Sequence, residues 1–172
     1  MKRIVFTILT VLTLVSCGDN HFATWRGFND KWYDDYRANG VGTDTGVIRT
    51  QILPSGVIIE SYHDGFGAIP KATNDPVTGK SSEVYVSMEG HLADGSLFLM
   101  RGITSYAVSD LVPGLCEAFK LMRQGSHWKV TLPYSMGYDS EGSSSLSEQN
   151  IFNVPPYSVL IFDIELIDVT NY

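Results

Sequence analysis

The sequence predicts a domain of the α+β class, in which an antiparallel sheet wraps around one short helix. Three observations lead to this prediction. Several segments alternate apolar and polar residues with the period of two that a half-buried strand requires. Glycine-containing turns separate these segments. One short stretch near the middle instead repeats its apolar residues at helical spacing, and a sheet that buries one face needs such a layer to cover it.

The first element expected in the folded part of the chain is an N-terminal helix over residues 28–39. Phe28, Trp32, Tyr33 and Tyr36 recur there at helical spacing. A helix with aromatic side chains along one stripe and charged side chains around it packs on another surface. Either the rest of the domain or a second copy of the chain can supply that surface.

Four extended segments are expected before the short helix. Residues 47–53 and 57–62 form a hairpin around a Pro-Ser-Gly turn. Residues 84–88 alternate as a central strand, and an Asp-Gly turn leads the chain into a further extended segment over residues 96–103.

The short helix begins at Pro113, because proline suits the first turn of a helix. Two strands follow it, residues 128–132 and 160–166, and each alternates as a half-buried antiparallel strand does. The apolar stripe of the helix consists of Leu115, Ala118, Phe119 and Met122.

Residues 1–16 have the layout of a bacterial lipoprotein signal peptide. Lys2 and Arg3 precede an apolar run that is too short to span a bilayer comfortably. The run ends in Leu-Val-Ser followed by Cys17, which resembles a lipobox, in which the cysteine is diacylated and becomes the mature N-terminus. We therefore expect Cys17 to carry a lipid anchor and residues 17–24 to act as a tether. The alternative is a plain signal peptide with an incidental cysteine.

Composition narrows the classes of ligand. Without the signal peptide, ten of the twelve basic residues remain against nineteen acidic ones, which gives a net charge of −9. Nucleic acid and anionic lipid surfaces need a cationic patch, so neither is expected as the ligand. The four histidines lack metal-ligand spacing, so no metal site is expected. Cys116 has no disulfide partner once Cys17 is acylated, and we interpret it as a half-buried free cysteine.

The last sixty residues carry an ordered series of motifs. A Val-Pro-Gly helix start at Val112, a tyrosine at Tyr138 after the next strand, and a Val-Pro-Pro sequence at Val154 before the final strand occur in that order. Upstream, residues 84–98 contain a strand, a glycine, an Asp-Gly turn and a phenylalanine. Over about residues 57–169, this series resembles the FKBP family of peptidyl-prolyl cis/trans isomerases.

The resemblance implies an FKBP-like domain over residues 57–172, preceded by a helix and hairpin extension over residues 25–56. It also implies a ligand groove between the short helix and the sheet. In that groove the backbone amide of Val112 and the hydroxyl of Tyr138 would meet carbonyl groups of the ligand. The residues implied for catalysis are Phe98, Val112, Tyr138 and Phe162. Those implied for substrate binding are Leu111, Leu115, Val154, Tyr106, Leu99 and Met88.

Isomerisation of a peptide bond before proline needs no nucleophile, metal or cofactor. The barrier of about 18 to 20 kcal/mol is set by amide resonance, and an apolar pocket with a few hydrogen-bond donors can lower it. This chain departs from the family pattern in that pocket. Leu99 stands in place of an aspartate, Leu115 in place of a tryptophan floor, Met88 in place of a tyrosine, and Asp139 in place of the glycine after the pocket tyrosine.

Three functions stay open at this point. The first is a peptidyl-prolyl isomerase, anchored at the bacterial cell envelope on the outer membrane or periplasmic face, that assists the folding of exported proline-containing polypeptides. The second is a catalytically weak FKBP-like chaperone that grips the same clients. The third is a lipoprotein that uses the helix at residues 28–39 and the loop at residues 140–150 for adhesion or scaffolding. All three leave the oligomeric state open.

Overall fold

The computed structural model describes residues 22–73, 77, 79–144 and 153–172. Within these residues, six strands and two α-helices form the fold, and short helical turns connect them. In chain order the elements are α1 (Ala23–Asp35), β1 (Arg49–Ile52), β2 (Ile58–His63), β3 (Glu83–Leu92), β4 (Leu97–Ala107), α2 (Pro113–Phe119), β5 (His127–Leu132) and β6 (Leu160–Thr170).

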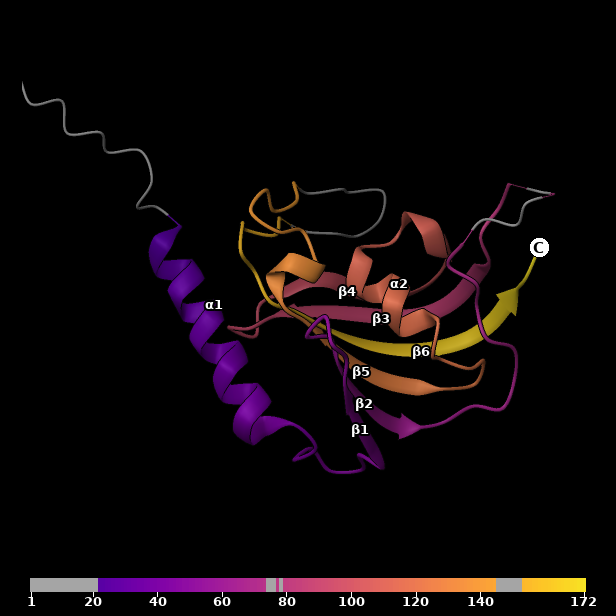
Figure 1. Cartoon of the computed structure of the whole chain (residues 1–172), viewed down its shortest axis with the longest axis horizontal. Coiled ribbons are helices and arrows are strands. Elements are labelled where there is room, and N and C mark those ends of the chain that lie inside the picture. Colours follow the sequence, from indigo (N-terminus) through magenta and orange to yellow (C-terminus); the bar gives the residue numbers. More distant parts are fainter. Residues whose placement is uncertain (1–21, 74–76, 78, 145–152) are drawn as a thin grey trace, which may run out of the picture.

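All six strands belong to one sheet with the order β1-β2-β5-β6-β3-β4, and every neighbouring pair is antiparallel. Figure 1 shows α2 packed across one face of this sheet and α1 to one side of it. The predicted fold class is therefore confirmed. None of the helices in the described part of the chain is both long and apolar enough to cross a membrane.

Several elements differ in extent from the prediction. β3 covers Glu83–Leu92 rather than residues 84–88, β6 continues to Thr170 rather than ending at Leu166, and β1 covers Arg49–Ile52 rather than residues 47–53. β4 continues to Ala107, beyond the expected end at Ile103, because it stays paired with β3 over its whole length. α1 begins at Ala23 rather than at Phe28, and after Asp35 it gives way to a turn of π-helix over Tyr36–Gly40.

The predicted signal peptide at residues 1–16 and the predicted lipid site at Cys17 lie outside the described residues, as does most of the predicted tether. The position of α1 corrects the predicted end of the tether at residue 24. Residues 23 and 24 form the first turn of α1, so the segment that can act as a tether is shorter than residues 17–24.

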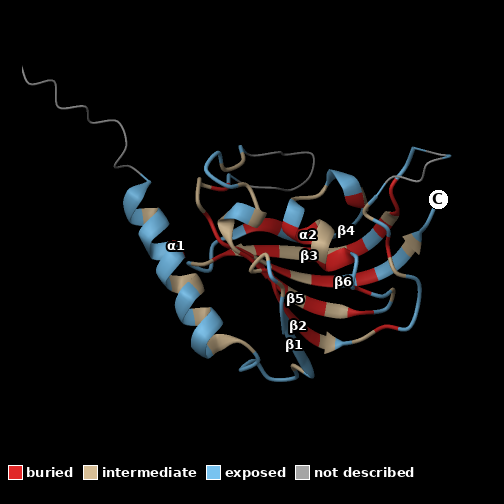
Figure 2. Cartoon of the chain, viewed as in Figure 1, coloured by how far each residue is buried: buried red, intermediate tan, exposed pale blue. Residues whose placement is uncertain are grey.

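The core lies between α2 and the face of the sheet that α2 covers. Buried and exposed positions alternate along the strands, most clearly on β3 and β6 (Figure 2). This alternation follows from the period of two of a strand, which sends successive side chains to opposite faces. Fully buried core side chains include Val84, Val86, Trp128, Val130, Leu132, Leu160, Ile164, Ala118 and Phe119.

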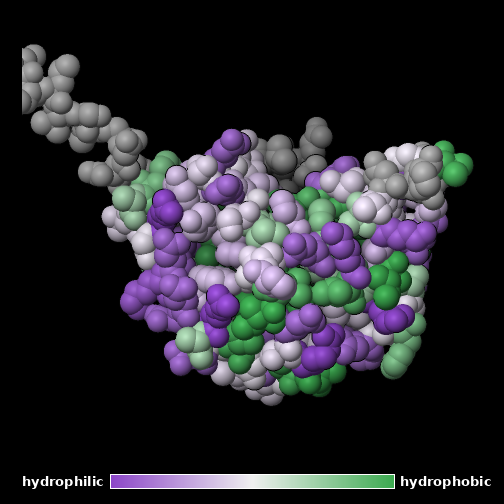
Figure 3. Space-filling view, viewed as in Figure 1, coloured by the Kyte–Doolittle hydropathy of each residue, from purple (hydrophilic) through white to green (hydrophobic). Residues whose placement is uncertain are grey.

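α1 packs one of its faces on its own domain. The indole nitrogen of Trp25 donates to the Ser158 hydroxyl at 3.0 Å, and the buried Asn29 accepts from the Val159 amide at 2.8 Å. Phe28, predicted on the packed aromatic stripe, is 41 % exposed instead. At 3.6 residues per turn it lies about 80° around the helix from Tyr36, which faces the domain. The outward surface of α1 is mainly hydrophilic (Figure 3).

A buried carboxylate joins the segment after α1 to the sheet. Glu60 on β2 is fully buried, accepts hydrogen bonds from the Tyr36 hydroxyl and from the Gly42 amide at 2.7 Å, and lies 3.1 Å from the Lys129 ammonium. Lys129 also pairs with Asp44. Burial alone would lower the pKa of Lys129, but its hydrogen bonds to Asp44, Tyr36 and Glu60 raise it well above the usual range. Lys129 therefore keeps its positive charge beside the buried carboxyl group of Glu60.

We predict that Lys129→Met lowers the free energy of unfolding by about 3 to 5 kcal/mol, because it leaves the buried Glu60 carboxylate without its counter-charge. Urea unfolding measures the change. Lys31→Met is the control, since the Lys31 side chain is 79 % exposed on α1, and we expect it to change stability by less than about 0.5 kcal/mol. A loss below about 1 kcal/mol for Lys129→Met would contradict the role given to the pair.

Candidate functional site

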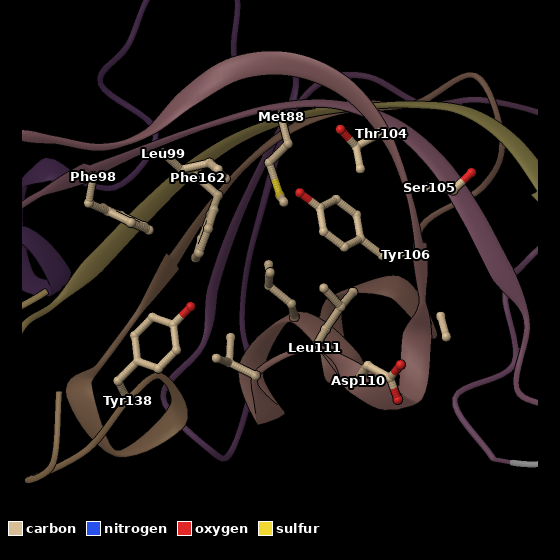
Figure 4. Close-up of a pocket in the computed structure, with 13 residues that line it drawn as sticks. Met88, Phe98, Leu99, Thr104, Ser105, Tyr106, Asp110, Leu111, Tyr138 and Phe162 are labelled. Carbon is tan, nitrogen blue, oxygen red and sulfur yellow. The ribbon is translucent and has the colours of Figure 1, made fainter. Parts of the chain in front are cut away.

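A cavity of about 510 Å³ opens between α2 and the sheet (Figure 4). Strands β3, β4 and β6 supply one wall, and the start of α2 with the turn before it supplies the other. Its lining residues are Met88, Phe98, Leu99, Thr104, Ser105, Tyr106, Ala107, Asp110, Leu111, Val112, Leu115, Tyr138 and Phe162.

Two phenylalanine rings form the most enclosed end of the cavity. Phe98 and Phe162 are 1 % and 3 % exposed, and their rings meet edge to face with centroids 5.3 Å apart. Gly90 on β3 pairs with Phe162 and leaves room for Phe98, because a Cβ atom at Gly90 would lie 2.5 Å from the tip of that ring. The sequence thus places a glycine where any side chain would push an aromatic wall into the cavity.

The start of α2 offers a free backbone donor. Val112 has extended backbone angles (φ −58°, ψ 149°), as expected before a proline, and its carbonyl accepts the first helical bonds from Leu115 and Cys116. Its own amide makes no backbone hydrogen bond within the described part of the chain. Val112 lines the cavity, so its amide can donate to a carbonyl of a ligand.

Two tyrosines point hydroxyl groups into the cavity, whose lining also includes the polar side chains of Thr104, Ser105 and Asp110. Tyr106 on β4 and Tyr138 in the loop after β5 point their hydroxyls into the space beside Phe162 and Met88 (Figure 4). Burial raises the pKa of both phenols. Both therefore stay protonated near neutral pH and can donate a hydrogen bond.

Nearly all the residues predicted for the site line this one cavity. The exception is Val154, which is buried in the core and pairs with Ser143 without reaching the cavity. The backbone bridge to Ser143 places Val154 outside the lining, and its contact with substrate stays a prediction. The sequence reasoning missed four lining residues, of which three follow from the underestimated length of β4. They are Thr104, Ser105, Ala107 and Asp110.

Cys116 is half-buried, as predicted, and it is not part of the cavity lining. Its thiol donates to the Val108 carbonyl at 3.0 Å and lies 3.3 Å from the Leu111 carbonyl. Burial raises its pKa, so the thiol stays protonated near neutral pH and is a poor nucleophile. Its contacts tie α2 to the turn that carries Leu111.

An apolar cavity with a few inward donors, set between a helix and an antiparallel sheet, defines a site for an apolar ring flanked by carbonyl groups. Proline within a polypeptide has this chemistry. The model of the FKBP-type peptidyl-prolyl cis-trans isomerases matches residues 75–167 of the chain. The chain therefore belongs to this family, which confirms the resemblance seen in its sequence.

Individual proteins support the assignment. The chain is 33% identical over 123 residues to the macrophage infectivity potentiator of Trypanosoma cruzi, a match that covers 69% of this chain and 56% of that protein. It is 34% identical over 122 residues to the outer membrane protein MIP of Legionella longbeachae, covering 69% and 46%. The chain thus spans about half the length of these curated relatives. The crystal structure of a peptidyl-prolyl cis-trans isomerase from Pseudomonas syringae shares the fold, with a TM-score of 0.67, 22% identity and coverage of 90% of this chain and 99% of that one.

We predict that Gly90→Ala narrows the cavity, because the added methyl group displaces the Phe98 ring toward Phe162. Overpacking of this kind costs about 1 to 3 kcal/mol. Thermal melting and titration with a proline-containing tetrapeptide measure the two effects, and we expect weaker binding by a protein that still folds. Gly102→Ala on β4 is the control, since its nearest neighbour lies 3.9 Å away. Equal peptide affinities for both variants would contradict this account of Gly90.

Proposed function

We propose that the protein catalyses cis–trans isomerisation of peptide bonds that precede proline in polypeptide clients. The observation that carries the proposal is the convergence of two aromatic walls, a free Val112 amide and the Tyr138 hydroxyl on one cavity. No metal or cofactor takes part in the mechanism.

In this mechanism the proline ring lies against Phe98 and Phe162, and the preceding carbonyl lies within the apolar cavity. Twisting the peptide bond breaks amide resonance and removes the charge separation that water stabilises in the planar form. The twisted amide therefore loses less solvation free energy than the planar amide when it leaves water. As a result, the apolar cavity stabilises the twisted form relative to the planar form. Each 1.4 kcal/mol gained in this way accelerates exchange about tenfold.

Hydrogen bonds fix the rest of the client. The Val112 amide donates to a carbonyl on one side of the proline, and the Tyr138 hydroxyl donates to another. Because both donors are preorganised by the fold, they hold the peptide without reorganisation as the bond twists.

Two leucines in the cavity favour a low rate of catalysis. Leu99 is 4 % exposed and Leu115 is 2 % exposed, so both present aliphatic surface where the family pattern has an aspartate and a tryptophan. An aliphatic wall holds an apolar ring but orients no polar group. These residues also support the second candidate, a chaperone-like module that binds the same clients with little catalysis. The third candidate is weaker, because α1 packs one of its faces on its own domain.

We further propose that the protein assists the folding of exported chains at the bacterial cell envelope, where a lipid on Cys17 anchors it. The support is the signal-like N-terminal sequence that ends in Leu-Val-Ser-Cys. The relative from Legionella longbeachae is also named as an outer membrane protein.

We expect the purified protein to accelerate cis–trans exchange of a tetrapeptide with leucine before proline, at a rate that is measurable by NMR exchange spectroscopy. Phe162→Ala should lower kcat/KM by about tenfold or more, because it removes an aromatic wall worth about 1.5 to 3 kcal/mol of contact. Ile167→Ala is the control, since Ile167 lies on the same strand but is 40 % exposed. Peptide binding without any acceleration would favour the binding-module candidate instead.

We expect Cys17→Ala to abolish incorporation of labelled fatty acid and to release the protein from the membrane fraction, because the thiol proposed to carry the lipid has been removed. Cys116→Ala controls for loss of the other cysteine, which is half-buried and should not affect membrane attachment. Fatty acid still incorporated into the Cys17→Ala protein would rule out this anchor.

A further inference from the structure

Two residues beside the cavity have a strained backbone. Among the described residues other than glycine, only Asp139 (φ 49°) and Tyr157 (φ 61°) adopt positive φ angles. This left-handed region is unfavourable for side chains with a Cβ atom, and it is a clear outlier for a residue as large as tyrosine. Asp139 directly follows the cavity residue Tyr138. Such strain persists only where the surrounding structure holds it in place.

Backbone hydrogen bonds connect the two strained residues. The Tyr157 amide donates to the Asp139 carbonyl at 2.7 Å, and the Asp139 amide donates to the Tyr134 carbonyl at 2.9 Å. Both backbone groups of Asp139 are therefore bound by Tyr134 and Tyr157. The position of Tyr138, one residue earlier, depends on where those two tyrosines lie.

A single guanidinium from α1 covers both tyrosines. The Arg26 side chain lies over the Tyr134 ring at 5.6 Å and over the Tyr157 ring at 4.9 Å, and its Nη2 donates to the Tyr134 hydroxyl at 3.1 Å. The two rings meet edge to face with centroids 5.5 Å apart. The bond between buried Asn29 and the Val159 amide holds α1 against the same segment of chain, one turn further along the helix.

We propose that Arg26 is a positioning residue for Tyr138. It holds Tyr134 and Tyr157 together, and these in turn keep Asp139 in the left-handed conformation that aims the Tyr138 side chain into the cavity. α1 is then part of the support of the site. This inference rests on the proposed function only through the role of the Tyr138 hydroxyl, because the placement of the ring can be measured without catalysis.

A double-mutant cycle tests the coupling. Arg26→Ala, Tyr138→Phe and the double variant are compared for kcat/KM with a leucine-proline tetrapeptide and for its Kd. We expect each single variant to lose about threefold to tenfold in kcat/KM and in affinity. The double variant should lose no more than the more damaging of the two single variants. Independent losses that multiply in the double variant would overturn the proposal. An Arg26→Ala protein with unchanged kcat/KM and Kd would also overturn it.

Matched variants separate positioning from general stability. Lys31→Ala removes another α1 cation, one that pairs with Asp35 on the same helix, and should change neither constant. Arg26→Lys keeps a cation over the rings and should recover part of the loss. Thermal melting shows whether any variant has unfolded.

The strain itself gives a further test. Glycine adopts a φ of 49° without cost, so Asp139→Gly in the Arg26→Ala background should restore part of the lost affinity. No recovery in a folded double variant would contradict the proposed route through Asp139.

One measurement does not depend on the activity. In protein with ring-labelled tyrosine, the NMR signal assigned to Tyr138 through Tyr138→Phe should shift in Arg26→Ala and not in Lys31→Ala. If the wild-type protein shows no isomerase activity, the proposed function fails while this shift still supports the positioning role. An unmoved Tyr138 signal overturns the positioning role whatever the activity.

Discussion

The pairing of β3 with β6 is the constraint on which the site depends. β3 lies between β6 and β4, and its register with β6 sets Gly90 beside Phe162. That position gives Phe98 from the neighbouring strand the space to meet Phe162 edge to face. A slip of one residue would send every side chain of the strand to the opposite face of the sheet. The aromatic end of the cavity therefore exists in one register only.

The sequence predicted the parts of this arrangement that follow from local periodicity. Alternation placed Met88 and Phe162 on the covered face, and the Val-Pro-Gly motif placed Val112 at the start of α2. Contacts between distant segments could not be found this way. Asn29 is polar, yet it is buried, and its amide oxygen accepts a hydrogen bond from the Val159 amide, 130 residues away. Phe28 was predicted to lie on the packed stripe of the helix. It is exposed, because the face of α1 that packs on the domain runs through Trp25.

The cavity departs from its family pattern in a consistent chemical direction. Leucines at positions 99 and 115 extend its apolar surface, while its donors lie at the start of α2 and on two tyrosines. Asp110 is the one acidic residue of the lining, and it is exposed. At Asp139 the backbone keeps the left-handed conformation that glycine adopts most easily, and aspartate is among the residues that best tolerate it.

The docking of α1 also limits how far the domain can reach from a bilayer. With a lipid on Cys17, only five residues separate the anchor from the first residue of α1, and they span about 18 Å at most. The polar headgroup layer occupies about 5 to 8 Å of that distance. Because α1 is bound to the domain through Asn29 and Trp25, it does not add to the length of the tether. A molecule anchored in this way would stay within a thin layer of solvent next to the lipid.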